Sequence, residues 1–289
     1  MNIALTGSSG LIGSKLLLDL KNMGHDVLCI SSSHSSPKDN IFLYEELKTI
    51  KVNFKADFLI HLASINSNLK ESQMLLEVDL LCKVIDTMEI LNCKNIIFFS
   101  TIKVYGENSF QYNLIDENSS LNPECFYGKA KAQCERVLEE LSNEKKFQYL
   151  IFRMPPLLIN DSKSNIGKLL QLVERGFPIP SFRAGDINYR SFLNYDLLTF
   201  VIKVTLRRGS ILSSQAFNLS DSEAISTNDL LKRFGKSINK KPRIIYLPNF
   251  LFKAMIKINR LQLILCKLFG NFHLSNENLR EAFKVPKSF

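Results

Sequence analysis

Short apolar runs alternate along the first half of the chain with longer stretches in which apolar residues recur at helical spacing. The apolar runs lie at 2–7, 25–30, 57–64, 95–101 and 148–154. Runs of this kind predict buried strands, because parallel strands covered on both faces are apolar throughout. Helical spacing marks 14–24, 74–91 and 127–142. Strands that alternate with helices predict an α/β fold built on a doubly wound parallel sheet.

The first predicted strand runs into a glycine-rich loop, GSSGLIG, which is followed by a helix and a second strand. Gly7, Gly10 and Gly13 give it the spacing G-x-x-G-x-x-G. Glycines let the backbone approach a pyrophosphate closely, and the free amides at a helix N-terminus face the anion. A plain turn between strand and helix would not need three glycines. We therefore expect a Rossmann-like dinucleotide-binding domain over 1–155, and a smaller, mainly substrate-binding region over 156–289 with elements that return to the first domain.

Tyr127 and Lys131 stand four residues apart at the start of a predicted helix, so their side chains share one helix face. By itself this pair is also typical of an ordinary solvated face. Thr101 ends the strand that precedes this helix, and ligands of open α/β sheets bind at the carboxyl ends of the strands. We therefore expect Thr101 to open onto the same crevice as the pair.

The composition is that of a folded chain, with 45% hydrophobic residues among 289. Its six cysteines are scattered without a C-x-x-C pair, which favours a reduced, cytoplasmic protein. No basic leader precedes the first strand, and no apolar run reaches the ~18 residues of a membrane span. Of the four histidines, His25, His34 and His273 show no metal-ligand spacing, and His61 is expected to be a buried histidine at a strand end. We expect no metal.

The positive charge is concentrated in the second half of the chain. Residues 1–150 hold 15 Lys/Arg against 19 Asp/Glu, whereas residues 151–289 hold 22 against 9. A basic half suits an anionic partner such as nucleic acid, an anionic membrane or a phosphorylated metabolite. Nucleic acid is disfavoured because no recognised binding module is present. In the segment 251–272, basic residues stand among apolar ones, which fits either peripheral membrane contact or a helix whose apolar face belongs to the core.

Taken together, the motifs resemble the extended short-chain dehydrogenases/reductases, the branch that contains the NAD-dependent epimerases and dehydratases of nucleotide sugars. The resemblance covers roughly residues 1–235. The segments that carry it are TGSSGLIG (6–13), HLAS (61–64), STIKVYG (100–106), YGKAK (127–131), RSFLNYDLL (190–198) and FNLSD (217–221).

The resemblance implies roles for particular residues. Tyr127 would be the general acid/base, Lys131 would favour its phenolate and hold the nicotinamide ribose, and Thr101 would position the sugar oxygen. Thr101 and Arg190 would contact the substrate, Arg190 at its diphosphate; a structural salt bridge is the alternative for this arginine. The implied cofactor-binding residues are Gly7, Ser9, Gly10, Leu11, Ile12, Gly13, Ser31, Ser32, Leu62, Ala63, Ser64, Tyr127, Lys131 and Pro155.

Two positions narrow the reaction that the resemblance implies. The 4,6-dehydratases of the family have Asp-Glu after the threonine, where this chain has Ile102 and Lys103. We therefore expect no dehydratase, but a 4-epimerase or a reductase of a 4-keto sugar. NAD-preferring members usually have an acidic residue where this chain has Ser31, which tilts the expected cofactor from NAD toward NADP.

Other expectations remain open from sequence. A Pro155-Pro156 pair stands where many relatives have Asn-Pro, and Asp79 stands at the position we assign to a common helix asparagine. A homodimer through the helices near 74–91 and 127–142 is implied by resemblance. The alternatives are a non-catalytic NADP-binding redox sensor or partner-binding protein, and a lipid-diphosphate-linked sugar in place of a nucleotide sugar as substrate.

Overall fold

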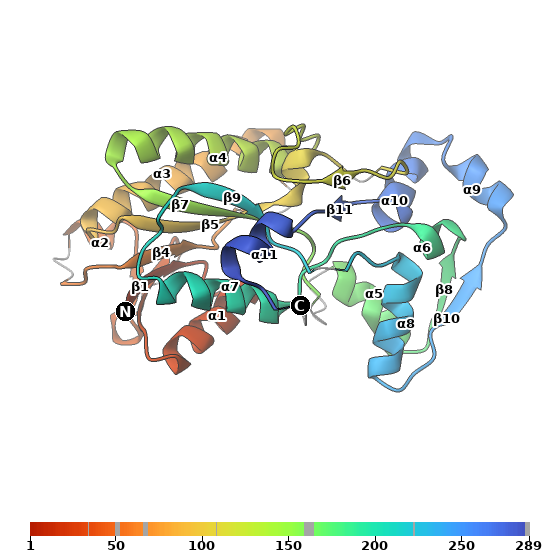
Figure 1. The fold of residues 1–289 in the computed structure, drawn as a ribbon, viewed down its shortest axis with the longest axis horizontal. Coiled ribbons are helices and arrows are strands. Elements are labelled where there is room, and N and C mark those ends of the chain that lie inside the picture. Colours follow the sequence, from red (N-terminus) through yellow and green to blue (C-terminus); the bar gives the residue numbers. More distant parts are fainter. Residues whose placement is uncertain are drawn as a thin grey trace. The chain divides into compact units, whose positions relative to one another are not determined.

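The computed structural model describes residues 1–33, 35–49, 53–65, 69–107, 109–158, 165–221 and 223–286. The chain forms two compact units (Figure 1). The first unit comprises 1–106, 120–153 and 199–217. The second comprises 107–119, 154–198 and the chain from 218 onward.

A seven-stranded sheet in the order β3-β2-β1-β4-β5-β7-β9 forms the centre of the first unit. Its strands are β1 (Asn2–Thr6), β2 (Asp26–Ser31), β3 (Ile41–Leu43), β4 (Phe58–His61), β5 (Asn95–Thr101), β7 (Gln148–Met154) and β9 (Gln215–Asn218). The neighbours from β3 to β5 pair in parallel. The expected α/β fold with a doubly wound sheet is confirmed.

Helices cover this sheet. They are α1 (Leu11–Asn22), α2 (Glu46–Thr49), α3 (Met74–Ile90), α4 (Phe126–Lys145) and α7 (Tyr195–Arg207), with 3₁₀ turns η1 (Pro37–Asp39), η2 (Glu71–Gln73) and η3 (Ile102–Tyr105). Helices α3 and α4 lie side by side (Figure 1). A single apolar core lies beneath them, formed by strand residues such as Leu59 and Phe98 and by helix residues such as Val84 and Leu138.

The predicted and observed elements agree where apolar pattern and length coincide. The run 95–101 is β5, which is buried from Ile96 to Thr101, and 148–154 is β7. The run 57–64 is shorter as a strand, because β4 ends at His61. The sequence pattern did not predict β3 or α2, which have only three and four residues.

The second unit carries two small parallel sheets and short helices. One sheet pairs β8 (Pro178–Ser181) with β10 (Arg243–Tyr246), and the other pairs β6 (Leu114–Ile115) with β11 (His273–Leu274). Its helices are α5 (Asn165–Glu174), α6 (Ala184–Ile187), α8 (Thr227–Ser237), α9 (Asn249–Met255), α10 (Asn259–Phe269) and α11 (Glu277–Phe283).

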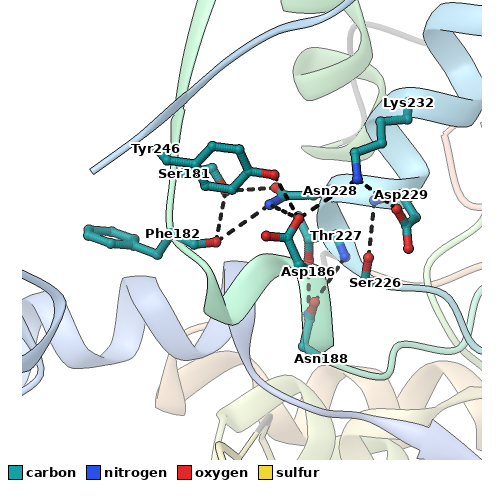
Figure 2. Close-up of polar contacts among 10 residues, drawn as sticks. All are labelled: Ser181, Phe182, Asp186, Asn188, Ser226, Thr227, Asn228, Asp229, Lys232 and Tyr246. Atoms are coloured by element: carbon teal, nitrogen blue, oxygen red, sulfur yellow. Dashed lines mark hydrogen bonds and ion pairs between the residues drawn. The ribbon is translucent and has the colours of Figure 1, made fainter. Parts of the chain in front are cut away.

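A polar network centred on Asp186 joins four elements of the second unit (Figure 2). One carboxylate oxygen of Asp186 on α6 accepts hydrogen bonds from Asn228 of α8 at 3.0 Å and Tyr246 of β10 at 2.8 Å. Asn228 in turn accepts a bond from Ser181 of β8 at 2.7 Å. These hydrogen bonds connect α6, α8, β8 and β10 through side chains.

Candidate active site

The glycine-rich loop adopts a geometry that only glycine permits at two positions. Gly7 has φ +74°, and a Cβ there would lie 2.6 Å from the amide nitrogen of Ala63. A Cβ on Gly13 would lie 2.0 Å from the carbonyl oxygen of Gly7. The Gly10 amide closes the turn by donating to that same oxygen at 3.0 Å. The motif therefore has no room for side chains at Gly7 and Gly13, and α1 begins within it at Leu11.

The start of α1 and the loop after β4 complete this edge of the sheet. The first-turn amides of an α-helix, here those of Leu11, Ile12 and Gly13, have no partner within the helix. The predicted residues Leu62, Ala63 and Ser64 follow β4 directly, and the Ala63 amide donates to the Thr6 hydroxyl at 3.2 Å. Free backbone amides at the start of a helix, at the carboxyl edge of a parallel sheet, fit a dinucleotide pyrophosphate.

Close packing of two backbones brings the Tyr127 region to the end of β5. Cys125 caps α4, its sulfur accepting a bond from the Gly128 amide at 3.4 Å. A Cβ on Gly128 would lie 2.5 Å from the carbonyl oxygen of Lys103, so only glycine lets α4 approach η3 this closely. Thr101, buried at the end of β5, caps η3. Thr101 and Tyr127 therefore belong to two segments in direct contact.

Lys131 forms a buried ion pair with Glu77 of α3, which the sequence analysis did not anticipate. Its ammonium nitrogen lies 2.9 Å from a Glu77 carboxylate oxygen, and the two side chains are only 2% and 1% exposed. Burial opposes the charge of Lys131, but Tyr127 and Glu77 outweigh it and raise the pKa of the ammonium above its ordinary value. Lys131 is therefore held as a cation that interacts electrostatically with Tyr127.

The ion pair also connects with the cofactor edge. The second carboxylate oxygen of Glu77 accepts a bond from the Ile65 amide at 2.8 Å, directly after the predicted cofactor residues Leu62 to Ser64. The Lys131 ammonium lies 4.7 Å from the centre of the Phe98 ring. The imidazole of His61 stacks on the same Phe98 ring, with 5.6 Å between the ring centres. His61 is buried, as expected. Glu77 thus links the lysine of α4 to the loop that follows β4.

A second buried network lies along α4. The Ser100 hydroxyl donates to Glu135 at 2.5 Å, and the Arg153 guanidinium donates to both Glu135 oxygens, the shorter ion pair being 2.8 Å. Arg153 also donates to the Tyr105 hydroxyl at 2.7 Å. The carboxylate and the phenol outweigh burial and raise the pKa of Arg153. This network joins β5, η3, α4 and β7 beside the proposed catalytic residues.

The remaining predicted residues lie elsewhere. Ser9 is in the glycine loop, Ser31 ends β2, and Ser32 follows it. Pro155 and Arg190 belong to the second unit. Asp79, the position we assigned to the family's helix asparagine, is exposed on α3. Among the described residues, no group of three or more His, Cys, Asp and Glu could hold a metal ion.

Arg190 is a half-buried guanidinium without a carboxylate partner in the described part of the chain. One of its nitrogens donates to the carbonyl oxygen of Lys267 at 2.5 Å, and its charged group lies 5.8 Å from the centre of the Phe192 ring. Burial lowers the pKa of the guanidinium to about 10. The alternative of a structural salt bridge is therefore not seen among these residues, and the guanidinium keeps donors for an anion.

Glu77 is the functional residue that sequence reasoning missed. The core-facing positions of α3 are Glu77, Leu80, Leu81, Val84 and Ile85, at helical spacing. A single carboxylate on such an apolar stripe indicates a buried partner of opposite charge, since acidic residues are almost never fully buried unless paired. Its partner was not readable, because the pairing depends on how α3 packs against α4.

Comparison with known proteins gives a consistent result. The model of the NAD dependent epimerase/dehydratase family matches residues 3–164. A UDP-glucose 4-epimerase from Vibrio cholerae is 25% identical over 99% of this chain and 92% of its own length. An N-acetyl-alpha-D-glucosaminyl-diphospho-ditrans,octacis-undecaprenol 4-epimerase from Escherichia coli O157:H7 is 26% identical over 86% of this chain and 75% of its own.

The fold is also that of a solved epimerase. The crystal structure of UDP-N-acetylglucosamine 4-epimerase from Bacillus cereus superimposes with a TM-score of 0.77, at 18% identity, over 100% of this chain and 94% of that one. At this identity the likeness concerns the fold alone. The family model covers more than half of the chain, and its span includes the glycine loop, Thr101, Tyr127 and Lys131. The chain therefore belongs to the NAD dependent epimerase/dehydratase family.

Proposed function

We propose that this protein is an NAD(P)-dependent enzyme that acts at C4 of a nucleotide sugar, foremost as a 4-epimerase. The observation that carries the proposal is the placement of Tyr127 beside a buried, charged Lys131 and next to the segment of Thr101. The related 4-epimerases from Vibrio cholerae and Escherichia coli support the same reaction class.

The roles proposed for these residues follow from their chemistry. Thr101 donates a hydrogen bond to the sugar O4 and holds it near the Tyr127 phenol. Tyr127 takes the O4 proton as phenolate and returns it later, which is general acid/base catalysis. The positive charge of Lys131 favours the phenolate form. A bound nicotinamide dinucleotide would supply the hydride chemistry at C4.

The glycine loop, α1 and the residues Leu62 to Ser64 are proposed to hold that dinucleotide. The close approach at Gly7 and Gly13 supports this assignment, because a backbone cradle without side chains admits a pyrophosphate. The family's description names NAD. Ser31 at the end of β2 carries no charge that would repel a 2′-phosphate, which supports NADP as the preferred form. Competition between NADH and NADPH for the protein decides between them.

The segment after Thr101 supports a reaction without loss of water. Ile102 is buried in η3 and cannot donate a proton, and Lys103 replaces the second acid of the dehydratases. We therefore propose that the protein does not dehydrate its substrate. Release of a 4-keto-6-deoxy product from a nucleotide hexose, detected by its carbonyl absorbance in alkali, would contradict this.

The second candidate is a 4-keto-sugar reductase, favoured by Ser31. NADPH usually serves net reduction, whereas a retained NAD that is reduced and reoxidised serves epimerisation. Both candidates use Thr101, Tyr127 and Lys131 in the same roles. The product analysis below separates them, since a reductase consumes NADPH in proportion to product and an epimerase consumes none.

The substrate's diphosphate is proposed to bind Arg190 in the second unit. Its free donors and its lack of a carboxylate partner among the described residues support an anion there. The substrate-binding role of the second unit and the dinucleotide-binding role of the first are proposals of the same kind. A lipid-diphosphate-linked sugar is the alternative substrate, supported by the relative from Escherichia coli O157:H7.

The test is product analysis with the full chain, NAD or NADPH, and three substrates: UDP-glucose, UDP-N-acetylglucosamine and a nucleotide-linked 4-keto-6-deoxyhexose. We expect inversion at C4, seen as the galacto product by NMR. Tyr127→Phe removes the acid/base and lowers the rate by about 100-fold or more. Tyr149→Phe, which removes a phenol from β7 in the same unit, leaves the rate unchanged. Dinucleotide binding without turnover on any sugar would instead support the non-catalytic sensor.

A further inference from the structure

Helices α9 and α10 bury one apolar face in the core of the second unit. Leu265 and Phe269 of α10 are buried against Phe182, in a cluster that Phe252 and Met255 of α9 complete. Phe182 meets Phe269 edge to face at 5.7 Å. This is the arrangement expected of a helix whose apolar side belongs to the core, and it accounts for only part of the apolar residues in the segment.

A second apolar face of α10 points to solvent. Leu263 is 57% exposed, Ile264 48% and Leu268 39%. Together with the exposed Arg260 and Lys267, they occupy positions i, i+3, i+4, i+7 and i+8, which form one stripe on a helix. Leu265 and Phe269, which face the core, do not belong to this exposed stripe. Helix α10 therefore has both a buried and an exposed apolar face.

The preceding helix and its link to α10 also expose apolar side chains. Phe250 in α9 is 68% exposed, and Leu251 and Ile258 are exposed as well. Six large apolar side chains within residues 250–268 are therefore in contact with water. We name them the apolar face of α9–α10: Phe250, Leu251, Ile258, Leu263, Ile264 and Leu268. Large exposed apolar residues concentrated in one segment of 19 residues favour an interaction site.

The charge around this face has one sign. Residues 230–276 contain ten Lys and Arg and no Asp or Glu. Lys253, Lys257, Arg260 and Lys267 are exposed and stand between the apolar residues. Within the described ranges, none of these four side chains has a carboxylate within ion-pair distance. The face therefore presents uncompensated positive charge to its partner.

We infer that the apolar face of α9–α10 lies on the surface of an anionic lipid bilayer. Aliphatic and phenylalanine side chains enter the interface, and the long stems of Lys and Arg let their charged ends reach lipid phosphates. A protein interface is a poorer fit, because lysine is depleted at the core of such interfaces. Here four basic side chains are interleaved with the apolar ones.

This contact is peripheral. No helix in the described part of the chain is long and apolar enough to cross a membrane. Helix α10 has 11 residues, whereas a span needs about 20. The two helices instead lie in the plane of the interface, with Leu265 and Phe269 turned to the protein core. The inference rests on this surface alone and does not depend on the reaction proposed above.

The experiment is flotation of the full chain with lipid vesicles. We expect binding to vesicles of phosphatidylcholine with phosphatidylglycerol, weaker binding to phosphatidylcholine alone, and release as the salt concentration rises. The variant Arg260→Gln with Lys267→Gln should weaken binding by roughly tenfold or more. The variant Leu263→Ser with Ile264→Ser should weaken it to a similar degree, and it keeps every charge.

The control is Lys203→Gln with Arg207→Gln, which removes two exposed basic residues from α7 of the first unit and should leave binding unchanged. All three variants change exposed side chains, and circular dichroism checks their fold. Absence of binding to anionic vesicles at low salt overturns the inference. So does equal loss in the control, which would indicate a general charge effect. A wild-type oligomer that dissociates in the Leu263/Ile264 variant also overturns it, because the face then covers a second copy.

Discussion

At the scale of single residues, the contact that most shapes the proposed site is the ion pair between Lys131 and Glu77. A lysine this deeply buried would tend to lose its proton, because burial disfavours the charged form. The interaction with Tyr127 and the Glu77 carboxylate at 2.9 Å together prevent this. The same carboxylate occupies one of the three donors of the ammonium and leaves two for other partners. Glu77 is therefore a positioning residue for Lys131 in the proposed function.

Replacing Glu77 by Gln tests this pair. The variant leaves a buried ammonium without a counter-charge, and removal of one partner of a buried pair costs roughly 3–5 kcal/mol. We expect a markedly lower free energy of unfolding in urea. Asp79→Asn, two residues later and exposed on the same helix, should change it by less than about 0.5 kcal/mol. Equal effects of the two substitutions would show that the ion pair does not form.

The pair also predicts a dependence of stability on pH. The pKa of Lys131 is raised above the ordinary value of 10.5 in the folded protein. Its stabilising contribution is therefore complete below about pH 10.5 and is lost as the pH rises through the folded pKa. Unfolding curves between pH 9 and 12 should show a steeper alkaline loss for the wild type than for Glu77→Gln. Parallel pH curves would be inconsistent with the raised pKa.

Single residues also show what the sequence could predict of the site. Gly7, Gly13, Thr101, Tyr127 and Lys131 were proposed from their motifs, because each motif follows one strand or opens one helix. The partner of Lys131 was not predicted, because the sequence alone does not show that α3 packs against α4 with Glu77 facing the lysine.

At the scale of elements, the network of Ser100, Glu135 and Arg153 holds β5, α4 and β7 together. Arg153→Met removes the counter-charge of a buried carboxylate, and we expect a loss of about 3–5 kcal/mol in stability. Arg233→Met breaks an exposed ion pair with Glu223 at 2.6 Å and should cost no more than about 1 kcal/mol. Chemical denaturation measures both. If the two variants lose the same free energy of unfolding, burial of the Arg153–Glu135 pair does not determine its contribution to stability.

The close backbone packing of the glycine loop gives a second prediction at the scale of elements. A methyl group on Gly13 would lie 2.0 Å from the Gly7 carbonyl oxygen, so Gly13→Ala forces the loop to shift. We expect the affinity for the dinucleotide to fall by at least tenfold, measured by quenching or enhancement of NAD(P)H fluorescence. Gly209→Ala also occupies a positive-φ position, at +77°, but meets no atom within 4 Å. It should lower stability slightly and leave the affinity unchanged.

The elements that the sequence predicted are those with a long and uniform pattern. Strand β5 and helices α3 and α4 each show one apolar periodicity over seven residues or more, and all three were found. Strand β3 and helix α2 are too short for a period to appear. For the second unit, the sequence predicted a smaller region over 156–289 but not its individual strands. Its order rests partly on side-chain bonds to Asp186, which no periodicity encodes.

At the scale of the whole molecule, the chain combines an acidic first half with a basic second half. The acidic half carries strands β1 to β5 of the central sheet, and the basic half carries Arg190 and the apolar face of α9–α10. Both basic features suit anions, one a substrate diphosphate and the other a lipid surface. They are separable, because Arg190 lies outside the face and the vesicle experiment needs no substrate.

The assembly state is a further prediction at this scale. Helices α3 and α4 pack side by side, and Leu75, Leu76 and Phe126 on them are exposed. We expect these helices to pair with those of a second copy in a homodimer. Sedimentation at micromolar concentration should give twice the mass of 33.0 kDa. Leu75→Asp with Leu76→Asp should yield a monomer, and a wild-type monomer at that concentration would refute the expectation.

The most direct test of the account is the dinucleotide itself. The purified full chain is denatured, the released small molecules are identified, and the stripped protein is titrated with NADH and NADPH. We predict that NAD(P) is released or that the stripped protein binds NAD(P)H, in a manner that Gly13→Ala weakens. Retained NAD(H) points to the epimerase, and preferential NADPH binding points to the reductase. If no dinucleotide is released and neither form binds, the assignment of the glycine loop is wrong, and the roles of Tyr127 and Lys131 are wrong with it.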